Sequence, residues 1–166
     1  TMPGALFVNL YGENNLSTVL NGKPLIVSQK TGYPFDGRVE LVVNAVGKKS
    51  LETINLRIPE WCTKATVTVN GEAQQVDIKP NTYVELNRQW KKGDVIVLDM
   101  DMRARLIESH PLVEESRNQV AIKRGPIVYC LEQQDVDANI DNVVIALEIS
   151  PYIKYFPIRH TLFEQS

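Results

Sequence analysis

The sequence predicts an all-β protein, an antiparallel β-sandwich or jelly roll of about ten strands. Its 166 residues include 41 β-branched side chains (19 Val, 13 Ile and 9 Thr) against 15 Leu and only 8 Ala. β-branched side chains lose rotamer freedom in helices and pack well on pleated sheets. Short apolar runs bounded by turn residues every 8–12 positions or so point to the same architecture. No stretch shows a convincing helical period.

Two Asn-Gly dipeptides mark hairpin turns. Asn21-Gly22 and Asn70-Gly71 each lie between short apolar runs, and Asn-Gly favours a tight turn because both residues tolerate positive φ. The run at 38–46 alternates apolar and polar side chains, as a half-buried strand does. Strands are therefore expected at residues 5–11, 16–20, 25–29, 38–46, 51–58, 64–69, 73–78, 83–86, 94–102, 120–123 and 127–132.

The length favours one domain, since domains average roughly 150 residues. We expect a β-sandwich over residues 5–149, with two small sandwiches divided near 48–50 or 105–111 as the alternative. Within that range, 135–141 reads as an acidic loop and 142–149 as a further candidate strand. Residues 150–166 show no clear period and are expected to form an irregular C-terminal segment.

Charge and hydropathy exclude several classes of partner. Lys and Arg total 18 and Asp and Glu total 20, which gives a formal net charge of −2. This balance argues against nucleic-acid binding through a basic surface. No apolar run approaches the roughly 18 residues of a transmembrane helix, so no membrane partner is expected.

Few side chains offer reactive chemistry. Neither His110 nor His160 lies in a nucleophile motif. Cys62 and Cys130 stand 68 residues apart with no further ligands nearby, so two free buried thiols are favoured over a disulfide or a zinc site. Asp99 and Asp101 share one face of a strand, and Glu114-Glu115 form a second pair; an outward acidic pair on an edge strand is the favoured interpretation. No catalytic or metal-binding residue is assigned.

The aromatic residues allow two interpretations. Trp61 and Trp90 lie at strand ends, and Tyr33 and Phe35 flank Pro34 in a turn. Exposed rings would form a platform for a sugar, which makes Trp61 and Trp90 the candidate carbohydrate contacts. The alternative is that these rings cover the ends of the core or contact a neighbouring domain.

Several short strings, taken together and in order, resemble the C-terminal β-sandwich region of glycoside hydrolase family 127, the β-L-arabinofuranosidases and their relatives. The resemblance covers about residues 5–147. The strings are VNLY (8–11), YPFDG (33–37), LRIPEW (56–61), VNG (69–71), YV (83–84), RQWKKGD (88–94) and RGPIVYCLE (124–132).

The resemblance implies that catalysis lies elsewhere. Members of the family carry an upstream (α/α)6 barrel with a cysteine nucleophile, a glutamate acid/base and a zinc ion held by cysteines and a glutamate. Neither Cys62 nor Cys130 matches the adjacent cysteines of that zinc site. The chain is thus expected to be a noncatalytic accessory domain without a cofactor of its own, and no enzyme by itself.

The expected partner is the catalytic barrel of the same parent chain, against which this domain would pack and which it would stabilise. The parent would be a bacterial glycoside hydrolase acting on arabinose-containing plant glycans. The alternative function is a carbohydrate-binding module that uses exposed aromatic rings. The compartment is left open between bacterial cytoplasm and periplasm, and an exposed apolar patch is expected where the barrel docks.

Overall fold

The computed structural model describes residues 4–47, 51–108, 110, 112, 114, 120–135, 137, 139 and 143. Their regular structure is β-strand apart from short 3₁₀ elements such as η2 (Gln133–Asp135), which confirms the all-β prediction. The chain divides into two compact units, Thr1–Cys130 and Leu131–Ser166, and every described strand belongs to the first. None of the described helices has the length and apolar character needed to cross a membrane.

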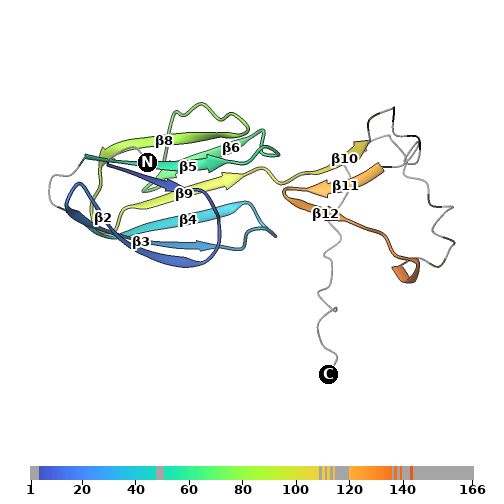
Figure 1. The fold of residues 1–166 in the computed structure, drawn as a ribbon, viewed down its shortest axis with the longest axis horizontal. Coiled ribbons are helices and arrows are strands. Elements are labelled where there is room, and N and C mark those ends of the chain that lie inside the picture. Colours follow the sequence, from blue (N-terminus) through green and yellow to red (C-terminus); the bar gives the residue numbers. More distant parts are fainter. Residues whose placement is uncertain are drawn as a thin grey trace, which may run out of the picture. The chain divides into compact units, whose positions relative to one another are not determined.

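The described strands between residues 4 and 102 form two sheets of unequal width (Figure 1). The wide sheet has six strands in the order β2-β3-β4-β9-β6-β7, and the narrow sheet has three in the order β1-β5-β8. The strands of the wide sheet are β2 (Asn14–Leu20), β3 (Lys23–Thr31), β4 (Arg38–Val46), β6 (Ala65–Val69), β7 (Glu72–Ala73) and β9 (Val95–Met100). Those of the narrow sheet are β1 (Ala5–Val8), β5 (Leu51–Ile58) and β8 (Thr82–Gln89).

The core lies between these two sheets. Strands β3, β4 and β9 bury alternate side chains, as a period of two requires, and the inward residues of β5 and β8 meet them from the other side. Side chains such as Leu41, Ile54 and Leu98 have almost no exposed surface. Full burial of such a side chain stabilises the fold by about 1.5–3 kcal/mol.

Both expected Asn-Gly turns are present. Asn21 and Gly22 have φ of 50° and 73°, and Asn70 and Gly71 have φ of 54° and 82°. Positive φ at both central residues matches the right-handed twist of the strands that the turn joins. The first turn connects β2 to β3 and the second connects β6 to β7.

A polar junction links the second of these turns to the start of β9. The Asn70 Nδ2 donates to Asp94 Oδ1 at 2.9 Å, and the Asn70 side-chain oxygen accepts from the Val95 amide at 2.8 Å. The Lys91 amide donates to the other Asp94 oxygen at 2.7 Å. Burial raises the pKa of Asp94, but the hydrogen bonds from Asn70 and Lys91, together with the positive charges of Arg88 and Lys91, outweigh it and lower the pKa below its usual value. Two of the strings singled out in the sequence, VNG and RQWKKGD, thus meet in space.

The prediction of a strand over 73–78 is wrong except at its first residue, because β7 ends at Ala73. The Gln74 amide makes a last hydrogen bond to the Val67 carbonyl oxygen, and the chain then leaves the sheet. Val76 and Ile78 still pack against the core from this irregular segment. Their alternation therefore reflects burial on one side rather than pairing in a sheet.

Two further expectations need correction. The sandwich is not wholly antiparallel, because β1 pairs with β5 in parallel. The acidic pair Asp99 and Asp101 is not on an edge strand, because β9 lies between β4 and β6. Instead, Asp101 forms an ion pair with Arg103 at 2.6 Å.

A third sheet follows the sandwich in the chain. It consists of β10 (Ala104–Glu108), β11 (Val120–Arg124) and β12 (Ile127–Tyr129), paired antiparallel in that order. The sequence analysis missed β10 because only the middle of its five residues is even half-buried, so the strand shows little apolar alternation. The expected strand at 142–149 and the expected irregular segment 150–166 lie almost wholly outside the described residues.

Substitutions at two glycines, Gly37 and Gly12, test how closely the chain packs next to β9. A Cβ added at Gly37 would collide with the Met100 carbonyl oxygen, whereas one added at Gly12 meets nothing within 4 Å. We expect Gly37→Ala to lower the free energy of unfolding by about 1–3 kcal/mol. We expect Gly12→Ala to leave it unchanged or raise it slightly. Urea unfolding of both variants checks this, and equal stabilities would contradict the close approach of Gly37 to β9.

Candidate functional site

Three aromatic rings gather at one end of the sandwich. Tyr33 stacks on Trp61 with ring centroids 6.4 Å apart and 20° between the planes, and Tyr11 meets Tyr33 edge-on at 5.8 Å. All three are partly buried against the core. The Tyr11 hydroxyl donates to the Arg57 carbonyl oxygen at 2.5 Å, and burial raises the pKa of Tyr11. One face of the Trp61 ring is therefore occupied by Tyr33.

Trp90 lies elsewhere, at the end of β8. Its side chain is 4% exposed, and its indole N–H donates to the Glu52 carbonyl oxygen at 2.8 Å. The Arg88 guanidinium lies 5.4 Å from the ring centroid, a cation–π arrangement. Little of this ring is left for a sugar to stack on. The two tryptophans proposed as carbohydrate contacts do not share one surface patch, and of the two only Trp61 keeps appreciable exposure.

Exposed side chains of β1 and of the segment after it lie near Tyr83 of β8, and we call this set the β1 face: Phe7, Asn9, Leu10 and Tyr83. Phe7 and Tyr83 meet edge-on with centroids 5.4 Å apart, and the Tyr83 hydroxyl donates to Asn9 Oδ1 at 2.8 Å. Exposure of these side chains is high for apolar residues, at 36% for Phe7, 43% for Tyr83 and 79% for Leu10. Exposed apolar side chains that gather in one patch typically mark a binding surface.

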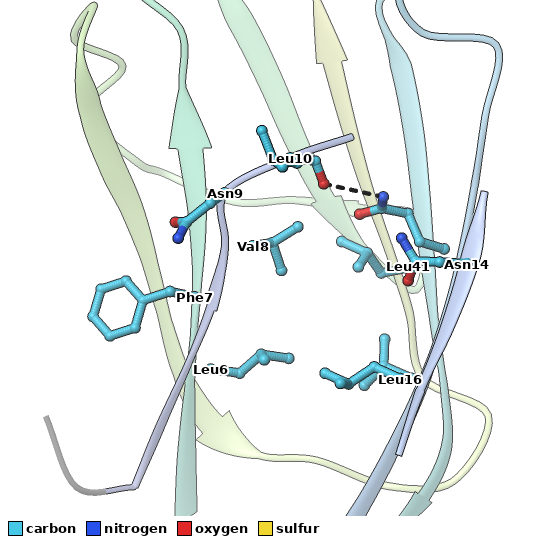
Figure 2. A pocket seen from close by; sticks show the side chains of 10 residues that line it. Leu6, Phe7, Val8, Asn9, Leu10, Asn14, Leu16 and Leu41 are labelled. Carbon is cyan, nitrogen blue, oxygen red and sulfur yellow. Dashed lines mark hydrogen bonds between the residues drawn. The ribbon is translucent and has the colours of Figure 1, made fainter. Parts of the chain in front are cut away.

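A cavity of about 170 Å³ opens beside the β1 face, between β1 and β2. Figure 2 shows Leu6 and Val8 pointing into it towards Leu16 and Leu41, while Phe7 points away to the outer side. The buried Gln29 amide donates to the carbonyl oxygens of Leu10 at 3.3 Å and Gly12 at 2.6 Å. These hydrogen bonds hold the segment after β1 across the opening.

The reactive residues singled out in the sequence do not converge. Cys62 is buried and Cys130 is exposed, and both are free cysteines. The expectation that both thiols are buried is therefore wrong for Cys130. His110 is exposed, and Glu115 and His160 lie outside the described residues. In the described part of the chain, no three His, Cys, Asp or Glu side chains come close enough to hold a metal ion. The zinc site that the resemblance implies belongs to the catalytic barrel and not to these residues.

The sequence analysis named Phe7, Leu10 and Tyr83 as candidates for no binding site, although Leu10 and Tyr83 belong to two of the strings that carry the family resemblance. One signal was available, because the run at 5–8 is apolar at every position. A strand that is buried on both faces shows continuous rather than alternating hydrophobicity. The sequence therefore already indicated that an apolar side chain, Phe7, points to the outer side of β1.

Comparison with known proteins identifies this arrangement as a β-sandwich domain of a glycoside hydrolase. The family described as "Beta-L-arabinofuranosidase, GH127 middle domain" matches residues 5–102, and "Glycoside hydrolase family 127 C-terminal domain" matches residues 104–159. The chain belongs to glycoside hydrolase family 127. The two matches meet at Arg103, between the last strand of the sandwich and β10.

Individual relatives are much longer than this chain. A non-reducing end β-L-arabinofuranosidase of Bifidobacterium longum subsp. longum is 34% identical over 128 residues, which are 74% of this chain and 19% of that protein. A solved structure described as a glycoside hydrolase is 51% identical with a TM-score of 0.78, over 82% of this chain and 23% of the other. A family 127 β-L-arabinofuranosidase from Geobacillus stearothermophilus T6 is 39% identical with a TM-score of 0.76. The match covers 86% of this chain and 22% of that one. The chain thus spans about a fifth of the length of the relatives it matches.

Tyr11 makes the aromatic end of the sandwich sensitive to alkali. The folded protein keeps the phenol proton above about pH 10, where the unfolded chain releases it, so stability is expected to fall as the pH rises further. Tyr11→Phe should lower the free energy of unfolding by about 1 kcal/mol at pH 7 and make this fall shallower. Denaturant unfolding at pH 7 and at several values above pH 10 measures both. Identical pH slopes for the two proteins would contradict the assignment, and Tyr83→Phe serves as the exposed control.

Proposed function

We propose that this chain is a noncatalytic accessory domain of a bacterial glycoside hydrolase that acts on arabinose-containing glycans. In this proposal it packs against an (α/α)6 catalytic barrel of the same parent chain and stabilises it. Family membership and the small share of each relative that the chain covers support a place within a larger hydrolase. The catalytic cysteine, the acid/base glutamate and the zinc ion would all belong to the barrel.

The observation that carries the proposal is the β1 face. Phe7 and Tyr83 meet on the outer side of the narrow sheet, and Leu10 is exposed on the segment that follows β1. Burial of each large apolar side chain against a neighbouring domain contributes about 1.5–3 kcal/mol. The Tyr83 and Asn9 side chains are already hydrogen-bonded to each other, so covering them leaves fewer polar groups unsatisfied.

The second candidate function is carbohydrate binding through an aromatic ring. Trp61 supports it, because this ring is only partly buried, and Phe35, two residues after its stacking partner Tyr33, is exposed. Against it, Tyr33 stacks on one face of Trp61, and Trp90 is buried. We therefore rank this function below docking to a barrel.

Docking predicts an effect that appears only in the parent enzyme. We expect Leu10→Asp to lower the temperature at which the full-length parent loses half its activity, because the charge would be buried against the barrel. In the isolated 166-residue chain the same substitution should leave the unfolding midpoint nearly unchanged, because Leu10 is 79% exposed. Heat inactivation of the parent and thermal unfolding of the chain supply the two measurements.

Val19→Asp is the matched control for docking. Val19 is also an exposed aliphatic residue, at 65%, but it lies on β2 and outside the β1 face. We expect Val19→Asp to leave the parent's heat inactivation unchanged. Equal losses for the two variants in the parent would show that the β1 face is not the docking surface.

Catalysis is expected to need the barrel. The purified 166-residue chain should not release the chromophore from a chromogenic β-L-arabinofuranoside, whereas the full-length parent should. An absorbance assay with both proteins at equal molar concentration decides this. Turnover by the chain alone, abolished by a substitution within it, would overturn the proposal.

A further inference from the structure

A polar groove runs along the free edge of β8. In the narrow sheet this edge lies opposite to the edge that β1 forms. Its volume is about 590 Å³, and it lies between β8 and the segment that follows β7. Gln74 and Gln75 line it from that segment, and Glu85, Asn87, Arg88 and Gln89 line it from β8. Known small-molecule sites have volumes of roughly 300–1,000 Å³, so the groove is large enough for a ligand.

The walls of the groove carry side-chain amides that are free to bind. Glu85, Asn87 and Gln89 are exposed and alternate along β8, so all three point to the same side. Among the described residues, no hydrogen bond joins the side-chain amides of Gln75, Asn87 or Gln89 to the protein. Each amide offers two donors and an acceptor.

The backbone edge of β8 adds to these groups. β5 pairs with β8 on one side, and no described strand pairs with it on the other. No backbone hydrogen bond between residues 74–80 and β8 is found within the described chain. The segment after β7 therefore leaves part of this edge open to a ligand.

We propose that this groove binds a neutral oligosaccharide. A sugar hydroxyl both donates and accepts hydrogen bonds, which matches amides that do the same. The groove is lined by charged residues of both signs, the acidic Glu85 and the basic Arg88 and Lys91. It therefore has no strong preference for a polyanion. Its walls are mainly polar, which disfavours an apolar ligand.

The groove and the β1 face are made of different residues, but both reach the same side of β8. Glu85 of the groove lies two residues from Tyr83 of the β1 face, about 7 Å along the strand, and Gln89 lies six residues from it, about 20 Å. Glycan binding can be tested on this chain alone, so the outcome does not depend on whether the β1 face docks.

Trp90 provides a reporter next to the groove. The chain has two tryptophans, so Trp61→Phe leaves Trp90 as the sole indole and also alters the competing aromatic site. The guanidinium that lies over Trp90 belongs to Arg88, which lines the groove. We expect arabinotetraose to produce a saturable change in the Trp90 fluorescence of the full 166-residue Trp61→Phe chain.

A double substitution tests the groove itself. In the Trp61→Phe background, Asn87→Ala with Gln89→Ala should weaken arabinotetraose binding about tenfold or more, since two or more hydrogen bonds are lost. Asn15→Ala, which removes an exposed amide from the edge strand β2, is the matched control and should leave the affinity unchanged. Thermal unfolding midpoints verify that each variant is folded.

Two outcomes would overturn the proposal. One is the absence of any saturable signal in fluorescence and calorimetry up to about 10 mM arabinotetraose. The other is a result in which the unsubstituted chain binds arabinotetraose, Trp61→Phe abolishes this binding, and the groove substitutions leave it intact. That result would place the sugar at the aromatic end of the sandwich instead.

Discussion

The fold depends on the burial of apolar side chains between two sheets that differ in width. Six strands face three, so the narrow sheet cannot cover the whole inner side of the wide one. At one margin, between β1 and β2, the uncovered region is an apolar cavity that Gln29 partly closes. At the other, the segment after β7 approaches β8 and leaves a polar groove. The proposed glycan groove therefore lies where the sandwich closes incompletely, whereas Phe7 and Tyr83 of the β1 face lie on the outer side of the narrow sheet.

The features of this fold that the sequence predicted correctly are those determined by residues close together in the chain. The Asn-Gly turns need positive φ at two adjacent positions, and few other dipeptides accept that conformation. The strand at 38–46 alternates because one of its faces lies in the core. Val76 and Ile78 alternate for the same reason without belonging to a sheet. Periodicity therefore reports on burial, and it is a guide to strand pairing only where turns also fix the register.

The candidate sites were less accessible to sequence reasoning because they depend on contacts distant in the chain. Nothing local distinguishes Trp61 from Trp90, and only the fold stacks one on Tyr33 and buries the other beneath Arg88. Asn87 and Gln89 are ordinary outward residues until the segment after β7 is brought alongside them. By contrast, the strings that carried the family resemblance include Asn70 and Asp94, and the hydrogen bond between these residues gives that similarity a structural reason.

The unequal environments of the two thiols have a practical consequence for labelling. Cys62 is buried, and this burial raises the pKa of its thiol and so suppresses the thiolate. Cys130 is exposed and is the last residue of the first compact unit. A maleimide dye or nitroxide added at neutral pH would therefore attach preferentially at this one position. Without any engineered cysteine, the protein thus offers spectroscopists a preferred anchoring point at the C-terminal end of its first compact unit.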